Sequence, residues 1–200
     1  MKLVIVAGLP ATGKSTLAKK IGSALGLPVL EKDEIKEELF DTVGYADLRE
    51  KRALDNAAGA ILLRCAEPLL QNGCSLLIVN NFDSAGKKAL EEMILRVGCQ
   101  CVTVFLGGDP DVLWQRYVER DKKRLRHMGH TFIDRYPPKD GDDIYATMPR
   151  EYFAERFERQ GMGDFELSGA RIDLDATDPA SIDVDALIIK VRKLIETKES

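Results

Sequence analysis

The chain has 200 residues, of which 44% are hydrophobic and 31% charged, and its formal net charge is −4. This length suits one domain with a full core, and the apolar fraction excludes a globally disordered chain. The slight acidity excludes a general attraction to nucleic acid, so any basic function must come from a local patch. We therefore expect a single domain over residues 1–200.

The N-terminal apolar run at residues 3–6 is too short for the core of a signal peptide, and no run is long enough to span a membrane. The four cysteines form no Cys-x-x-Cys pair, which argues against a zinc or redox site. Cys99 and Cys101 are expected to open a buried strand as small apolar residues. We expect a cytoplasmic protein with no membrane partner.

The first half of the chain has the pattern of successive strand–helix units. Strands are expected at 3–7, 28–30 and 75–79. The first strand is followed by a helix that ends at Gly26, and the second by a helix that Asp33 caps. A longer helix precedes the third strand. We expect its core face to consist of the apolar positions at helical spacing, which are Leu54, Ala57, Ile61, Cys65 and Leu69.

The second half continues the alternation, which predicts a parallel sheet. Its expected elements are a helix at 87–97, a strand at 101–106, a helix from Asp109-Pro110, a strand at 170–174 and a helix from about Ser181. Residues 122–149 break this rhythm with prolines, histidines and many charges. Because long irregular segments in compact domains are usually functional lids or insertions, we expect a lid over about residues 116–148.

The octapeptide at residues 8–15 matches the pattern Gly-x-x-x-x-Gly-Lys-Ser in full, between a predicted buried strand and an amphipathic helix. Its glycines let backbone N–H groups point at phosphate oxygens, Lys14 is expected to reach the β- and γ-phosphates, and the Ser15 hydroxyl to bind magnesium. A glycine turn without a ligand is the alternative, and the strand–loop–helix context argues against it. The expected nucleotide-binding residues are Gly8, Leu9, Pro10, Ala11, Thr12, Gly13, Lys14, Ser15 and Thr16. The predicted cofactors are ATP and Mg²⁺.

Residues 4–18 resemble the nucleoside-monophosphate-kinase-like branch of P-loop proteins. More closely, they resemble the small ATP-dependent kinases that include zeta toxin, chloramphenicol phosphotransferase and the kinase domain of polynucleotide kinase. Further similar segments are Lys32-Asp33-Glu34-Ile35-Lys36, Asn81-Phe82, Arg126-His127-Met128-Gly129-His130 and Asp173-Leu174-Asp175-Ala176-Thr177. With the alternating pattern, the resemblance implies a three-layer α/β P-loop NTPase. Its five-stranded parallel sheet would have the order 2-3-1-4-5, and a basic lid would cover it.

The resemblance also assigns roles to residues outside the phosphate loop. It implies that Asp33, the acid after the second strand, orients or deprotonates the acceptor hydroxyl or contributes to the magnesium site. The alternative is that Asp33 only caps its helix. It further places Arg126 in the lid and Thr177 near the nucleotide.

This sequence departs from the kinase group in three places. Where an acid is common after the third strand, the chain reads Val79-Asn80-Asn81, so Asp33, Asp83 or water would have to complete the magnesium shell. Lys36 stands where arginine is common, which puts bidentate phosphate binding there in doubt. Met128 replaces the usual lid proline.

The lid is strongly basic. Between residues 116 and 139 there are eight lysines or arginines against three acids. Arg116 and Arg120 are four residues apart and share a helix face, so we expect both to contact one triphosphate and to stabilise the transferring phosphoryl group. Arg126 is a third candidate catalytic cation. The alternative is a solvated charged helix.

These features predict an ATP-dependent phosphotransferase that moves the γ-phosphate to a hydroxyl of a small molecule or nucleotide. A kinase for nucleic-acid 5′-hydroxyls is an alternative that the basic lid favours, although interleaved aromatic residues are lacking. Asp83-Ser84-Ala85-Gly86 resembles the GTPase Asp-x-x-Gly element, but no Asn-Lys-x-Asp motif follows the fourth strand. The missing third-strand acid also leaves open a non-catalytic ATP-binding protein. The pattern identifies neither the acceptor nor the oligomeric state.

Overall fold

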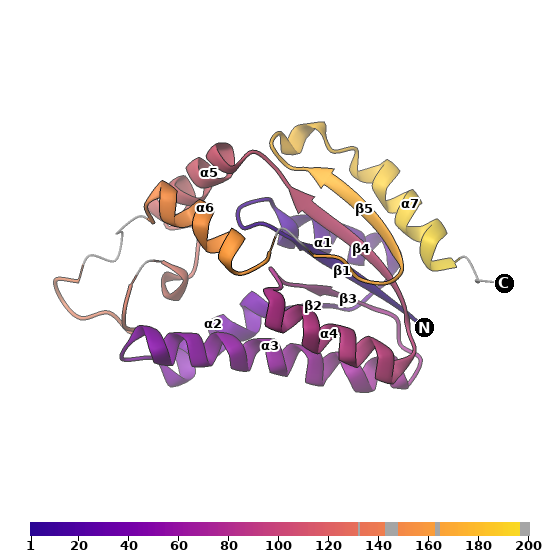
Figure 1. Ribbon diagram of the computed structural model, residues 1–200, viewed down its shortest axis with the longest axis horizontal. Helices are drawn as coiled ribbons and strands as arrows, with labels where there is room; N and C mark the ends of the chain where they lie inside the picture. Colours follow the sequence, from indigo (N-terminus) through magenta and orange to yellow (C-terminus); the bar gives the residue numbers. More distant parts are fainter. Residues whose placement is uncertain (132, 143–147, 163–164, 197–200) are drawn as a thin grey trace.

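A parallel β-sheet forms the centre of the protein (Figure 1). The computed structural model describes residues 1–131, 133–142, 148–162 and 165–196. The strands are β1 (Lys2–Gly8), β2 (Val29–Glu31), β3 (Leu76–Val79), β4 (Gln100–Gly107) and β5 (Ala170–Asp175). Their order is β2-β3-β1-β4-β5, and all neighbouring strands are parallel. The predicted sheet order and the α/β class are thus confirmed.

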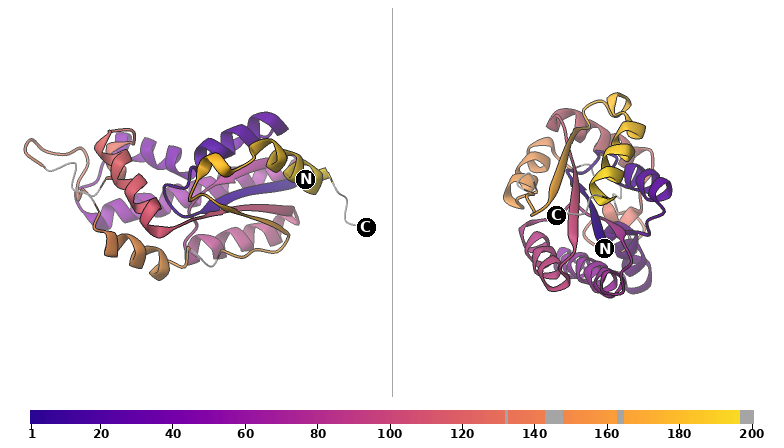
Figure 2. Two further views of the ribbon diagram at one scale, coloured as in Figure 1. Left: turned by 90° about the horizontal axis from the view of Figure 1, so that it is seen from above. Right: turned by 90° about the vertical axis from the view of Figure 1, so that its right-hand side faces the viewer.

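Two pairs of helices cover the two faces of the sheet, which gives three layers (Figure 2). Helices α1 (Lys14–Leu25) and α7 (Val184–Glu196) lie on one face, and α3 (Leu48–Gln71) and α4 (Ser84–Val97) on the other. Because side chains alternate along a strand, Val4 and Val6 pack toward α1 and α7, whereas Leu3 and Ile5 pack toward α3 and α4.

The buried face of α3 differs from the prediction by one residue. Ala58, Leu62, Ala66 and Leu70 are fully buried, whereas Ile61 and Leu69 keep 38% and 37% exposure and Cys65 is exposed. Both stripes repeat every four residues and lie about 100° apart around the helix. The four-residue repeat alone therefore does not indicate which stripe is buried. Packing decides which stripe is buried, because the small side chains of Ala58 and Ala66 allow α3 to lie close against the sheet and α4.

Three further helices surround the carboxyl edge of the sheet. Helix α2 (Lys32–Val43) follows β2 and packs on α3, and α5 (Pro110–Lys122) follows β4. Helix α6 (Arg150–Arg159) was not predicted, because charged residues dominate its sequence. It is held by Phe153 and Phe157, which pack on Leu113 and Tyr117 of α5 in a core of their own. Short 3₁₀ turns occur at Met128–His130 and Pro179–Ser181.

Two further details of the strands and helices occur as predicted. Cys99 and Cys101 are buried at the start of β4. Gly26 and Gly98 end their helices in the left-handed conformation. None of the helices in the described ranges is long and apolar enough to cross a membrane.

Candidate active site

The loop between β1 and α1 is shaped by residues with unusual backbone conformations. Gly8 has φ 131°, and a Cβ there would lie 2.0 Å from the main-chain oxygen of Leu106, so only glycine lets the loop leave β1 beside β4. Ala11 and Gly13 have φ 60° and 87°. A left-handed alanine is strained, and such strain tends to persist at ligand sites. Helix α1 begins at Lys14 without a side-chain cap, so its first N–H groups remain available to an anion.

Lys14 folds back into this loop. Its buried Nζ lies 2.6 Å from the main-chain oxygen of Leu9 and 3.5 Å from Oγ1 of Thr12. Burial lowers the pKa of Lys14 to about 7, although the charge of Asp33 raises it in part. The ammonium group therefore lacks a full counter-charge, which the phosphates of a nucleotide would supply.

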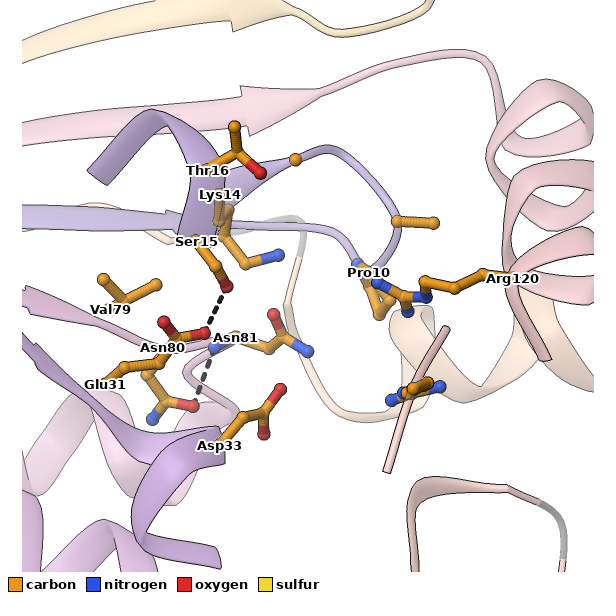
Figure 3. Close-up of a pocket in the computed structure, with 13 residues that line it drawn as sticks. Pro10, Lys14, Ser15, Thr16, Glu31, Asp33, Val79, Asn80, Asn81 and Arg120 are labelled. Carbon is orange, nitrogen blue, oxygen red and sulfur yellow. Dashed lines mark hydrogen bonds between the residues drawn. The ribbon is translucent and has the colours of Figure 1, made fainter. Parts of the chain in front are cut away.

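A polar cleft of about 110 Å³ opens beside the loop (Figure 3). Figure 3 shows Glu31, Asp33 and Asn81 on one side of it and Arg120 on the other. Its lining residues are Pro10, Ala11, Gly13, Lys14, Ser15, Thr16, Glu31, Asp33, Val79, Asn80, Asn81, Arg120 and Arg126. The fold thus brings together most of the predicted site residues, from five separate segments of the chain.

Glu31 is the residue that the sequence analysis missed. It ends β2, is only 7% exposed, and its Oε1 accepts a hydrogen bond from the Ser15 hydroxyl. Its buried Oε2 has no hydrogen-bond partner among the described residues. Burial raises the pKa of Glu31, and the bond from Ser15 offsets this in part. An acid that directly ends the second strand is the signal for it in the sequence, although the family resemblance implied Asp33, two residues later.

The pair of Ser15 and Glu31 fits a magnesium ion. A hydroxyl and a carboxylate are hard oxygen ligands, and magnesium binds through one or two carboxylates together with water and substrate phosphates. The orphaned Oε2 is an acceptor that a cation or its water shell would satisfy. Glu31 therefore supplies an acid next to Ser15, although β3 ends without one.

We expect Glu31→Gln to weaken magnesium binding by about 10-fold or more in the presence of ATP. The same change should not lower the melting temperature without magnesium, because it removes a buried charge with an unsatisfied oxygen. Magnesium titrations of ATP binding and thermal melts measure the two effects. If ATP binding by Glu31→Gln required the same magnesium concentration as in the wild type, Glu31 would have only a structural role.

Asp33 does not cap α2, contrary to one expectation. The helix begins at Lys32 with Glu31 in the cap position, and Asp33 lies in the first turn. Its carboxylate lies 3.1 Å from Nζ of Lys36, which in turn lies 3.0 Å from Asp55 of α3. Burial would raise the pKa of Asp33, but the Lys36 charge and more distant cations outweigh this and lower it well below its usual range. Asp33 is therefore an ionised carboxylate facing the phosphate loop.

Two arginines face Asp33 across the cleft. The guanidinium groups of Arg120 and Arg126 lie 5.9 and 4.8 Å from the ring centre of Tyr117. Nη1 of Arg126 forms an ion pair with Oδ1 of the buried Asp121 at 3.6 Å, which is longer than a hydrogen bond. Nε of Arg120 and Nη1 of Arg126 are buried and have no hydrogen-bond partner within the described ranges. Such donors favour binding of an anion.

Arg116 and Thr177 lie outside this cleft. The Arg116 guanidinium donates to the main-chain oxygens of Ala176 and Thr177. Thr177 Oγ1 accepts from the N–H of Asp109, 2.8 Å away. The prediction that Arg116 and Arg120 meet one triphosphate is not supported, since one turn of α5 carries Arg116 toward the loop after β5. Thr177 thus connects the start of α5, and Arg116 the middle of α5, to the loop after β5. A contact of Thr177 with the nucleotide stays a prediction.

Asp83 is not available as a replacement magnesium ligand. It caps α4, where its carboxylate accepts from the N–H of Gly86 at 2.7 Å, and it does not line the cleft. Capping also accounts for the likeness of Asp83-Ser84-Ala85-Gly86 to a GTPase element.

With this geometry established, comparison with known sequences gives the family. The sequence pattern of the AAA domain family matches residues 3–132. The chain belongs to this family. A shikimate kinase from Rhizobium leguminosarum bv. trifolii (strain WSM2304) is 29% identical over 130 residues. That match covers 61% of this chain and 59% of the relative, so the chain matches about three fifths of the relative's length.

Solved structures show the same fold. A protein of Chloroflexus aurantiacus J-10-fl described as a candidate kinase superposes with a TM-score of 0.76 and 28% identity, covering 96% of this chain and 97% of its own. A shikimate kinase of Bacteroides thetaiotaomicron gives 0.56 at 16% identity, with 98% of both chains covered. A gluconokinase of Sinorhizobium meliloti 1021 gives 0.54 at 16% identity, with 97% and 94% covered. This AAA domain protein thus has the fold of P-loop kinases.

Proposed function

We propose that this protein is an ATP-dependent phosphotransferase that moves the γ-phosphate to a hydroxyl group of a small molecule. One observation carries the proposal. A carboxylate, Asp33, and two arginines with unsatisfied buried donors converge with the phosphate loop on a single cleft. A protein that only bound ATP would need the loop, but it would not need an ionised acid across from it.

Each group has a part in the proposed transfer. Lys14 and the first N–H groups of α1 hold the triphosphate, and Ser15 with Glu31 would hold magnesium. When bound, magnesium neutralises charge on the transferring phosphate. Asp33 accepts a hydrogen bond from the acceptor hydroxyl and orients it for in-line attack on the γ-phosphorus. The hydroxyl oxygen forms a bond to the γ-phosphorus while the bond from that phosphorus to the bridging oxygen of ADP breaks, and ADP leaves. The hydroxyl proton passes through Asp33 to the solvent. Arg120 and Arg126 stabilise the negative charge on the phosphoryl oxygens.

The similar proteins suggest where to look for the acceptor. A shikimate kinase and a gluconokinase are named for small hydroxylated acids. The described cleft lining includes no aromatic side chain on which a base could stack. We therefore place small polar alcohols ahead of nucleosides and oligonucleotide 5′-ends.

Transfer of radiolabelled phosphate from ATP to a panel of acceptors tests the proposal. The panel contains shikimate, gluconate, neutral sugars, nucleosides, hydroxylated antibiotics and an oligonucleotide with a free 5′-hydroxyl. We expect transfer to a small molecule that requires magnesium and is lost in Lys14→Ala. Transfer to the oligonucleotide alone would support the alternative kinase, and ATP binding without transfer to any acceptor would support a non-catalytic protein.

The predicted lid over about residues 116–148, of which 132 and 143–147 lie outside the described residues, has its own test. We expect an ATP analogue with magnesium to slow amide hydrogen exchange from Arg116 to Arg126, because Arg120 and Arg126 gain an anionic partner and closing lids exclude water. Residues 127–131 should change less, since they are already bonded to α2. Equal exchange with and without the analogue would contradict a lid that responds to ATP.

A further inference from the structure

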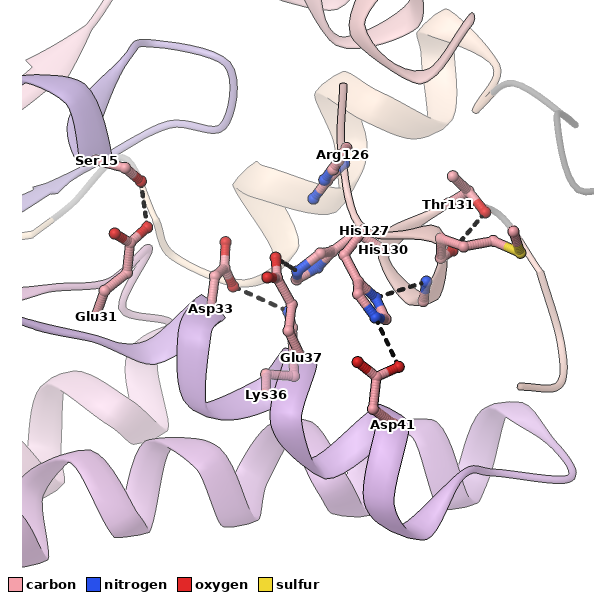
Figure 4. A network of polar contacts seen from close by, with 12 residues as sticks. Ser15, Glu31, Asp33, Lys36, Glu37, Asp41, Arg126, His127, His130 and Thr131 are labelled. Carbon is pink, nitrogen blue, oxygen red and sulfur yellow. Dashed lines mark hydrogen bonds and ion pairs between the residues drawn. The ribbon is translucent and has the colours of Figure 1, made fainter. Parts of the chain in front are cut away.

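Arg126 is followed by a segment that is fastened to α2. Nε2 of His127 lies 3.0 Å from Oδ1 of Asp41, and Nε2 of His130 lies 2.9 Å from Oε1 of Glu37 (Figure 4). Glu37 and Asp41 are one helical turn apart. Nδ1 of His127 also accepts from the N–H of Gly129 at 3.0 Å, which closes the 3₁₀ turn. Residues 126–131, here called the arm, therefore have two polar attachments on α2.

The arm also packs closely against an aromatic ring. A Cβ on Gly129 would lie 2.3 Å from Cδ2 of Phe40, a ring of α2 that is 1% exposed. The main-chain oxygen of Gly129 accepts from the Tyr45 hydroxyl at 3.2 Å. Position 129 therefore requires glycine because a larger residue would collide with Phe40. Backbone conformation is not the reason, since the φ of Gly129 is not in the left-handed range.

Further bonds hold the end of the arm. Lys51 of α3 donates to the main-chain oxygens of Thr131 and Ile133, at 2.9 and 3.1 Å. Burial lowers the pKa of His130 to about 4, so its imidazole is neutral at pH 7 and donates to the Glu37 carboxylate. The arm belongs to the same body as α2 and α3.

We propose that His127, Gly129 and His130 are positioning residues that hold the Arg126 guanidinium in the cleft, by fixing the arm to α2. The inference rests on the proposed function for the role of Arg126 in phosphoryl transfer. Because α2 also carries Asp33, the fixed arm sets the spacing between the acid that orients the acceptor and the cation opposite it. Arg120, which extends from α5, has no such attachment to α2 in the described residues.

The first test needs no acceptor. The Nε–H signal of Arg126 in ¹⁵N-labelled protein is assigned by its loss in Arg126→Lys. In the wild type it should lie apart from the signal of free arginine, because Arg126 packs on Tyr117 in a buried site. In Gly129→Ala the signal should move to the chemical shift of free arginine. Adding Phe40→Leu to Gly129→Ala should return the signal to its wild-type shift, because the smaller side chain leaves space for the new methyl group. His130→Ala is the second variant, in case Gly129→Ala does not fold.

Leu125→Ala is the matched control, because Leu125 is the neighbour of Arg126 and is 72% exposed. It should leave the signal unchanged. An unmoved Arg126 signal in both Gly129→Ala and His130→Ala would overturn the proposal, whatever the enzyme activity.

The second test uses an acceptor identified by phosphate transfer. Gly129→Ala should lower kcat by about 10²-fold, the usual effect of misplacing a group by about 1 Å, while KM for ATP changes less than about twofold. Free guanidinium should partly restore both Arg126→Ala and Gly129→Ala, which a general loss of structure would not allow. A loss of kcat without rescue would overturn the positioning role. A displaced Arg126 signal with no transfer to any acceptor would instead contradict the proposed function and leave the positioning of Arg126 supported.

Discussion

Lys14→Ala should abolish phosphate transfer and weaken ATP binding by about 10²-fold or more, the usual effect of removing a charged donor from a transferring phosphate. The ammonium is buried in the loop and donates to the main-chain oxygen of Leu9, so it is held where the loop would bind the phosphates. Calorimetric titration with ATP measures the affinity. Thermal stability should change little, because the substitution removes a poorly solvated charge.

The pH dependence of ATP affinity is a second test of the role of Lys14. The pKa of Lys14 is about 7 in the free protein, and phosphates would raise it on binding. Binding then takes up a proton, so the affinity should fall by up to about 10-fold per pH unit as the pH rises above 7. Lys14→Ala should lose this slope. ATP affinity unchanged by Lys14→Ala would count decisively against the phosphate loop as the nucleotide site.

Asp33→Asn should spare ATP binding and lower phosphate transfer by about 10²-fold, the usual contribution of a positioned base. The structure strengthens this prediction, because Asp33 is not the helix cap and its carboxylate faces the cleft. Its lowered pKa also makes it a weak proton acceptor, so its main role would be to orient the hydroxyl. The rate should therefore not fall through protonation of Asp33 between about pH 8 and 5. Steady-state rates across this range, with the identified acceptor, check both points.

Asp83→Asn is the matched control for Asp33→Asn. It makes the same chemical change at an aspartate that caps α4 outside the cleft, and asparagine caps a helix as well as aspartate does. It should keep full transfer and stability. Wild-type transfer in Asp33→Asn would return Asp33 to a structural role and leave the base unassigned.

The sequence by itself was enough to predict the phosphate loop and the sheet. The loop is eight contiguous residues, so its chemistry depends on local spacing and on the strand and helix beside it. The sheet order followed from the alternating pattern, since right-handed crossovers and the family resemblance leave few topologies. Asp33 could be placed near the loop for the same reason, because the carboxyl ends of parallel strands meet at one edge.

Only the tertiary structure decided which side chains reach that edge. Arg116 and Arg120 share a helix face, yet only Arg120 lines the cleft, because the loop after β5 takes up Arg116. Glu31 became a candidate magnesium ligand through its contact with Ser15, 16 residues away. The arm contacts α2 through pairs such as His130 and Glu37, which lie 93 residues apart in the sequence. Contacts of this kind depend on how distant segments pack, and local periodicity carries no information about that packing.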